Sequence, residues 1–274
     1  MLKTRILTAI VVLPLFLSAL FFLQDIFWGT LLLALTVIGS REWSQLARFS
    51  VRNTIFFMLL TTLAGGELLF QLSESVKVDA YSSDPMWVYV LSAIFWIVCA
   101  PLYLKQLYVV KNPYIWMLIG WILLLPTCLA LYQLRTISPL LLLGFMATIW
   151  ISDTAAYFTG RSFGKHKLAP TISPNKTWEG VVGALIAVLI YGLVWDSWLN
   201  AESIASKLVP LLLFMAILGI IGDLYESLIK RHAEVKDSGN ILPGHGGILD
   251  RIDALTSSLP LAILALLIFY SPAL

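Results

Sequence analysis

The stretch that decides how this chain is organised runs from Asp223 to Asp253 and reads DLYESLIKRHAEVKDSGNILPGHGGILDRID. It lies between two long apolar runs of a chain that is 59% hydrophobic and only 12% charged. A soluble domain of this length carries roughly twice that charged fraction. The composition therefore predicts a membrane protein whose reactive groups are gathered in a few polar segments.

Helical spacing makes the first part of this stretch interpretable. The intervals i, i+3, i+4 and i+7 place two acids, a hydroxyl and a base on one helix face. These residues are Asp223, Glu226, Ser227 and Lys230. Four glycines then predict a loop, because a missing Cβ lets the backbone approach an anion or adopt a positive φ. They are Gly239, Gly244, Gly246 and Gly247.

Windows of about twenty apolar residues indicate spanning helices, and nine of them predict an all-α, polytopic integral membrane protein. They cover approximately residues 6–23, 26–40, 54–72, 86–104, 113–133, 138–158, 181–199, 207–224 and 255–272. The second window is short, and an extension toward Leu46 is open for it. We expect residues 1–135 to form N-terminal membrane helices. Residues 136–274 then form a second membrane region that carries two polar loops, at 159–180 and 225–254. The first window favours an uncleaved anchor over a signal peptide, since no small-x-small cleavage site follows it.

Lysine and arginine are distributed unevenly between alternate loops. Fifteen of the eighteen lie at the N-terminus or in the even-numbered loops, and the exceptions are Lys77, Arg135 and Lys207. Positive residues are retained on the cytoplasmic side of a membrane. We therefore predict a multi-pass protein of the cell (inner) membrane, with its N-terminus and its glycine-rich segment in the cytoplasm.

Two cysteines and one acid lie within the apolar runs. Cys99 and Cys128 lack the spacing of metal ligands, so neither a zinc site nor a disulfide framework is expected. Glu67 is an acid within a predicted span and is therefore a functional candidate. Structural hydrogen bonding and a substrate role are both open for it, and the first is favoured.

A second polar segment, residues 152–180, lies on the same predicted side as the glycine-rich segment. Asp153, Glu179 and Asp223 fall at the ends of three predicted spans, where an unpaired carboxylate is costly. Neutralisation by nearby lysines is one interpretation, with Lys165, Lys167 and Lys176 available. A divalent metal is the other, and oxygen ligands without thiolates favour Mg²⁺ over zinc.

The mixture of acids and bases indicates a polyphosphate that metal bridges to the protein, with lysine and arginine on the remaining phosphate oxygens. Residues 173–179 also begin a predicted helix, which Ser173, Asn175 or Thr177 could cap, and helix N-termini attract phosphate. For His245 three roles are open: a general base, a phosphate donor and a residue that shapes the loop.

Several other sites are absent from the sequence. There is no G-x-x-x-x-G-K-[ST] phosphate loop, no Asp-rich pair of a polyprenyl transferase and no Asp-Gly-x-x-Ala-Arg pattern of an alcohol phosphotransferase.

A transporter for Mg²⁺ or a phosphorylated solute is a rival interpretation, disfavoured because the ionisable residues gather at one membrane face. A CTP-dependent lipid kinase is a closer rival, which its products would distinguish.

The glycine-rich segment resembles the signature of the CDP-diacylglycerol synthases, also called phosphatidate cytidylyltransferases. The matching run is Ser227-x-Ile229-Lys230-Arg231, four residues, Lys236-Asp237-x-Gly239, two residues, then Leu242-Pro243-x-His245-Gly246-Gly247-Ile248-x-Asp250-Arg251-Ile252-Asp253. Residues 222–227 and 173–180 are also similar to family patterns. The resemblance covers the last half of the chain strongly, whereas the first four or five spans match only in being hydrophobic.

The resemblance implies transfer of CMP from CTP to phosphatidic acid, which gives CDP-diacylglycerol and pyrophosphate for phospholipid biosynthesis. It also implies dependence on Mg²⁺, with a second, monovalent cation such as K⁺ as a further expectation. The expected partners are CTP, phosphatidic acid, the lipid bilayer and a second copy of the chain in a homodimer, and no nucleic acid is expected. Residues 1–135 would then be scaffold and dimerisation helices, and residues 136–274 the catalytic region with cytoplasmic loops at 159–180 and 225–254.

The site residues that the resemblance implies fall into three groups. The catalytic residues are Asp223, Asp250, Lys230, Arg231 and His245. The metal ligands are Asp223, Asp250, Asp153, Glu179 and Asp253. The substrate-binding residues are Lys165, Lys167, Ser173, Lys176, Thr177, Ser227, Lys236, Gly246, Gly247 and Arg251.

Overall fold

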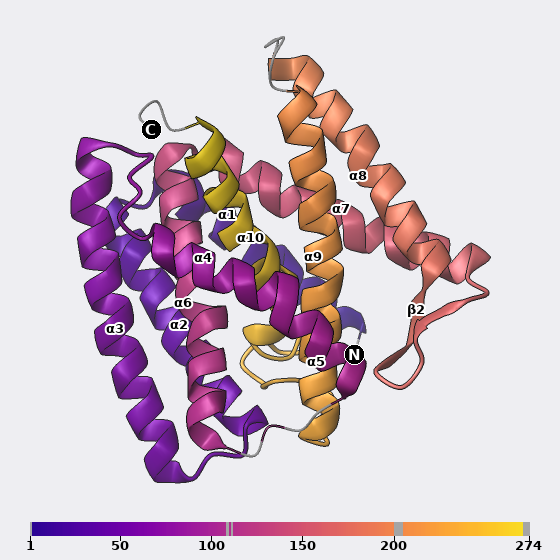
Figure 1. The fold of residues 1–274 in the computed structure, drawn as a ribbon, viewed down its shortest axis with the longest axis horizontal. Coiled ribbons are helices and arrows are strands. Elements are labelled where there is room, and N and C mark those ends of the chain that lie inside the picture. The colour runs from indigo at the N-terminus through magenta and orange to yellow at the C-terminus, as the bar shows by residue number, and fades with distance from the viewer. Residues whose placement is uncertain (1, 108–109, 111, 200–204, 271–274) are drawn as a thin grey trace.

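The fold is a bundle of long helices, seen in a computed structural model that describes residues 2–107, 110, 112–199 and 205–270 (Figure 1). Its elements in chain order are α1 (Leu2–Phe22), α2 (Asp25–Leu46), α3 (Val51–Val78), α4 (Met86–Ile94), the π-helix η1 (Phe95–Cys99), α5 (Ala100–Gln106), α6 (Pro113–Ile137), α7 (Pro139–Phe163), β1 (Lys167–Ala169), β2 (Ser173–Thr177), α8 (Trp178–Leu199), α9 (Ala205–His232) and α10 (Leu249–Tyr270). The predicted all-α membrane architecture is confirmed.

Seven helices of the described residues are long and apolar enough to cross a membrane. They begin at Val51, Met86, Pro113, Pro139, Trp178, Lys207 and Leu249. Each of the nine predicted windows falls on a helical segment, but α1 and α2 are not among these seven. The predicted count of nine spans is therefore not confirmed, and α2 ends in polar residues such as Glu42 that lower its hydropathy.

The helices form two groups that α10 joins. Helices α2, α3 and α6 pack against one another, while α7, α8 and α9 form the second group (Figure 1). Helix α10 contacts α9, α6 and α4. Many of the large apolar side chains on outer helix faces are exposed, for example Leu63 on α3 and Ile186 on α8. Such faces suit contact with lipid rather than water.

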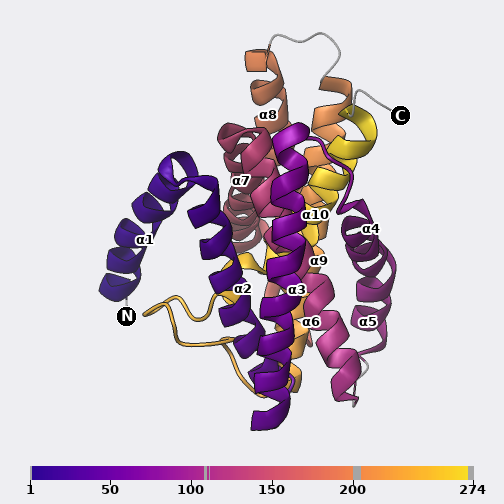
Figure 2. The same ribbon diagram turned by 90° about the vertical axis from the view of Figure 1, so that its left-hand side faces the viewer.

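Helix α1 leans away from α2, and its first turns lie beside the glycine-rich segment (Figure 2). The Thr8 hydroxyl donates a hydrogen bond to the Pro243 carbonyl, 2.9 Å away. The N-terminal helix therefore contacts a loop that the sequence places more than two hundred residues later.

A β-hairpin occupies part of the segment predicted as a loop and helix start. Strands β1 and β2 are antiparallel, with Lys167 opposite Thr177 and Ala169 opposite Ser173. Helix α8 begins only at Trp178, and the Thr177 hydroxyl accepts a hydrogen bond from the Gly180 amide at 3.2 Å. Of the three caps that the sequence offered, Thr177 is the one that bonds to the helix.

Arg135 binds the connection between α1 and α2, although the sequence analysis places it in an outer loop. Its side chain is only 7% exposed. It donates to the Leu20 carbonyl at 2.8 Å, to the Leu23 carbonyl, and to the Asp25 carboxylate at 2.7 Å. The guanidinium also lies over the Trp28 ring, 5.3 Å from its centroid. One buried cation thus satisfies carbonyls at the end of α1.

Replacing Arg135 by Leu should lower the free energy of unfolding by about 2–4 kcal/mol, because two buried carbonyls lose their donors. Replacing Asp25 by Asn should cost less than about 1 kcal/mol, since Asp25 is 67% exposed. Thermal unfolding in detergent, followed by tryptophan fluorescence, measures both changes. An equal loss in the two variants would show that the ion pair, and not the carbonyl contacts, carries the effect.

Candidate functional site

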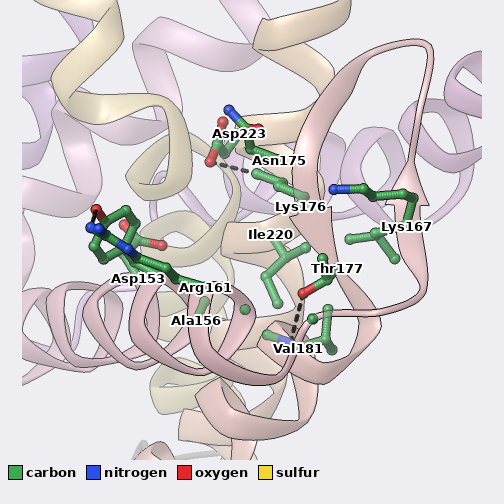
Figure 3. A pocket seen from close by; sticks show the side chains of 15 residues that line it. Asp153, Ala156, Arg161, Lys167, Asn175, Lys176, Thr177, Val181, Ile220 and Asp223 are labelled. Carbon is green, nitrogen blue, oxygen red and sulfur yellow. Dashed lines mark hydrogen bonds and ion pairs between the residues drawn. The ribbon is translucent and has the colours of Figure 1, made fainter.

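A cavity of about 710 Å³ opens between α7, the hairpin, the start of α8 and α9 (Figure 3). Its charged lining residues are Asp153, Arg161, Lys167, Lys176 and Asp223. Carboxylates and cations therefore line one space, as the mixture of signs in the sequence predicts.

The residues that line the cavity come from separate elements, and the local structure of each element directs their side chains into it. On α7, Asp153, Tyr157 and Gly160 follow the i, i+4, i+7 spacing of one helix face. Lys176 projects from β2, and its ammonium lies 2.5 Å from the Asp223 carboxylate of α9 (Figure 3). The hairpin thus brings a cation against an acid that the chain places almost fifty residues later.

The acids around the cavity are close enough to interact. Asp153, Asp223 and Asp253 repel one another electrostatically. Lys176 compensates Asp223, and no hydrogen bond to the Asp153 carboxylate occurs among the described residues. A cation or a substrate donor would find an available carboxylate there.

A second cluster lies where the glycine-rich loop, defined here as residues 237–248, meets α9 and α10. The Lys230 ammonium lies 2.7 Å from Asp250 and 3.3 Å from Glu226. The other Asp250 oxygen accepts from the Ser238 amide at 2.8 Å, the Ser238 hydroxyl at 2.9 Å and the Gly247 amide at 2.9 Å. Asp250 therefore fixes the loop while it pairs with Lys230.

Asp253 connects the two clusters, because it interacts electrostatically with Asp223 and with Lys230. Asp250 does not line the cavity that contains Asp223. Within the described ranges no three His, Cys, Asp or Glu residues are arranged to hold a metal ion by themselves. That Asp223 and Asp250 are metal ligands stays a prediction.

Glu179 faces the turn before the hairpin and is not among the residues that line the cavity. Its carboxylate accepts from the His166 amide at 3.2 Å and pairs with His166 Nδ1 at 2.7 Å. The His166 side chain is exposed and has this acidic partner. A metal-binding role for Glu179 stays a prediction.

The remaining predicted residues lie around these clusters. The Ser227 hydroxyl donates to Asp223 at 3.3 Å, and the Arg231 Nε lies 3.5 Å from the Ile172 carbonyl of the hairpin turn. Ser173 begins β2. The side chains of three residues are exposed and make no hydrogen bond or ion pair within the described part of the chain: Lys165, Lys236 and Arg251.

His245 has a structural role through its backbone, since its amide donates to the Leu242 carbonyl at 2.8 Å. Its Nδ1 atom is buried and has no hydrogen-bond partner among the described residues. The backbone contact fits the loop-shaping role, and the two chemical roles of the ring stay predictions.

The sequence analysis missed Glu42, which lies on α2 and is 3% exposed. Its carboxylate accepts from the Ile248 amide at 3.0 Å, the Leu249 amide at 2.9 Å and the Ser238 hydroxyl at 3.3 Å. The predicted second window covers residues 26–40, and its open extension toward Leu46 would include Glu42, but no role was assigned to this acid. An acid near the end of an apolar run is the signal that could have identified it.

At two positions of the loop, carboxylates of the protein lie so close to the backbone that only glycine, which has no Cβ atom, fits. Gly246 has φ +83°, and a Cβ there would lie 2.5 Å from an Asp250 oxygen. A Cβ on Gly247 would lie 2.5 Å from both Glu42 oxygens. The expected close approach to an anion thus occurs, but in this structure the anions are Asp250 and Glu42.

Comparisons with known proteins extend over nearly the whole chain. The model of the cytidylyltransferase family matches residues 3–269. A phosphatidate cytidylyltransferase of Haemophilus influenzae is 34% identical over 281 residues, which covers 95% of this chain and 96% of that protein. One of Pseudomonas aeruginosa is 34% identical over 272 residues, with 95% of each chain covered. One of Staphylococcus saprophyticus is 48% identical over 131 residues, covering 48% of this chain and 50% of that protein. The similarity therefore includes N-terminal helices that the sequence motifs alone leave out.

Proposed function

The chain belongs to the cytidylyltransferase family, and we propose that it transfers CMP from CTP to phosphatidic acid, giving CDP-diacylglycerol and pyrophosphate. The observation that carries the proposal is the cavity in which Asp153 and Asp223 face Arg161, Lys167 and Lys176. A nucleotide triphosphate and a lipid phosphate are both anions, so a site that joins them must supply cations and hold them in place.

The residues at the cavity fit Mg²⁺. Their donors are carboxylate oxygens without a thiolate, and Mg²⁺ is usually held by one or two carboxylates together with waters and substrate phosphates. Asp153 and Asp223 would hold the ion from the cavity wall, and Asp253 adds negative charge that interacts with both of them. When bound, Mg²⁺ would neutralise charge that develops on the phosphates.

The mechanism that we propose is an in-line displacement. A phosphate oxygen of phosphatidic acid bonds to the α-phosphorus of CTP, and the bond from that phosphorus to the bridging oxygen of the β-phosphate breaks. Pyrophosphate leaves with the electron pair. Because the nucleophile is already an anion at neutral pH, the site needs no strong base.

The chain's cations would orient the phosphates. Lys176 can exchange its Asp223 partner for a phosphate oxygen without leaving the cavity wall, and Lys167 and Arg161 line other parts of the same space. Arginine forks bind phosphate oxygens in pairs, which fixes orientation as well as charge. These contacts reduce the repulsion between the two substrates.

The lipid would approach from the bilayer with its tails in the hydrocarbon. Apolar and aromatic side chains near the cavity are exposed on its α7 and α8 sides: Tyr157, Phe163 and Trp178. We further propose that the cavity faces the cytoplasm, that the membrane is the cell (inner) membrane, and that the protein is a homodimer. The mass of the detergent-solubilised protein, measured by light scattering, tests the last point.

The decisive assay incubates purified full-length protein with phosphatidic acid, CTP and Mg²⁺, with and without a chelator, and identifies the products. We expect CDP-diacylglycerol and pyrophosphate, both abolished by the chelator. CDP together with a newly phosphorylated lipid would instead identify a kinase. Unchanged substrates with Mg²⁺ present would reject the proposed transfer.

A further inference from the structure

Glu42 lies on a helix of the N-terminal half, yet within the described chain the hydrogen bonds of its carboxylate go to the glycine-rich loop and the start of α10. Ser238 at one end of that loop and Ile248 and Leu249 at the other bind the same carboxylate. One side chain therefore closes the loop from outside it, and the loop ends cannot separate without breaking these bonds.

The start of α10 depends on this contact for a physical reason. The residue before the helix is Ile248, and the side chain of isoleucine has no atom that can accept a hydrogen bond from the free amides of the first helical turn. Glu42 supplies the missing acceptor from α2. The positive end of the helix dipole also favours an anion there. Among the described residues Glu42 forms no ion pair, so amides, a hydroxyl and this dipole balance its charge.

The contact reaches Asp250 through two routes. The Ser238 hydroxyl lies 3.3 Å from a Glu42 oxygen and 2.9 Å from an Asp250 oxygen, so one hydroxyl lies between two carboxylates. The Gly247 amide, which donates to Asp250, directly precedes the Ile248 amide that donates to Glu42. If the Glu42 bonds are lost, the donors that orient Asp250 lose their support.

We infer that Glu42 is a positioning residue for the reaction: it sets the glycine-rich loop so that Asp250 keeps its orientation toward Lys230. The inference rests on the proposed function. It assigns to α2, which packs against α3 and α6, a direct part in shaping the catalytic half. The N-terminal helices are then more than a scaffold.

The test compares Glu42→Gln with Glu74→Gln in the full-length enzyme. Glutamine keeps the size of Glu42 but replaces one acceptor oxygen by an NH₂ group that cannot accept from the loop amides. Glu74 is the matched control, because this exposed acid on α3 pairs with Lys77 three residues away, at 2.5 Å, and is not among the residues that line the cavity. The readouts are kcat and KM for CTP, and hydrogen exchange of the amides of residues 238–249.

We expect Glu42→Gln to lower kcat by about tenfold, which corresponds to the loss of one charge-assisted hydrogen bond. Exchange of the loop amides should rise while exchange in α3 and α6 stays at the wild-type level. Ser238→Ala should lower kcat less in the Glu42→Gln background than in wild type, because residues in one hydrogen-bond network are not additive. Glu74→Gln should match wild type.

Wild-type kcat and unchanged loop exchange in Glu42→Gln would overturn the inference. A rise in exchange throughout the bundle would overturn it too, since that is the behaviour of a residue that only stabilises the fold. The proposed function is judged separately by the products of the wild-type enzyme. If these contain no CDP-lipid, that proposal fails, whereas the exchange data still decide whether Glu42 holds the loop.

Discussion

Replacing Asp223 or Asp250 by Asn is expected to reduce CDP-lipid formation by roughly 10²-fold or more. Each change is isosteric and removes one negative charge. At Asp223 the change deprives Lys176 of its anionic partner on the cavity wall. At Asp250 it replaces an oxygen by an NH₂ group, either toward Lys230 or toward the donors of the loop. The Asp223 variant therefore tests a carboxylate at the cavity wall, and the Asp250 variant tests a carboxylate that orients the loop and Lys230.

The comparison needs a variant with the same chemical change elsewhere. Asp79 is exposed at the end of α3 and accepts a hydrogen bond from the Tyr81 amide, so Asp79→Asn should leave turnover unchanged. Membrane insertion and elution on size exclusion should be normal in all three proteins. Near-normal turnover in both Asp223→Asn and Asp250→Asn would reject the assignment of these carboxylates to the site.

The cavity residues could be predicted because local rules place them. Helical spacing and the cost of a carboxylate near hydrocarbon single out Asp153 and Asp223 without any knowledge of the tertiary structure. The spacing also predicts the neighbours on α9: Ser227 bonds to Asp223, and Lys230 pairs with Glu226. Neutralisation of an acid by Lys176 was one of two interpretations of the sequence, beside a bound metal. The structure pairs Lys176 with Asp223, a partner that the sequence alone could not identify.

Contacts between distant segments lie beyond that reasoning. Glu42 and Ser238 are 196 positions apart, and no periodicity in either segment relates them. The hairpin of β1 and β2 forms in a segment predicted as a loop and a helix start, and its two short strands pair with each other. Strands this short carry too few residues for a recognisable alternating pattern. The environment of Asp250 was also unexpected, since donors from its own loop satisfy one of its oxygens.

Replacing Lys230 by Met is expected to have the second large effect, on stability as well as activity. Its side chain is only 13% exposed and lies between Glu226 and Asp250, both buried. Removing one partner from a buried ion pair typically costs about 3–5 kcal/mol, because uncompensated charge stays behind. The matched control is Lys77→Met, which should cost less than about 1 kcal/mol, since Lys77 is 67% exposed beside Glu74.

A second substitution separates the two roles of Lys230. Adding Glu226→Gln to Lys230→Met removes one of the stranded charges, so the double variant should recover part of the lost thermal stability. Activity should stay low, because a neutral pair restores neither the cation beside Asp250 nor a donor for phosphate. Thermal unfolding and CDP-lipid formation are measured on the same preparations. If both recover together, Lys230 acts only by balancing buried charge; if stability recovers alone, its ammonium group is needed at the site itself.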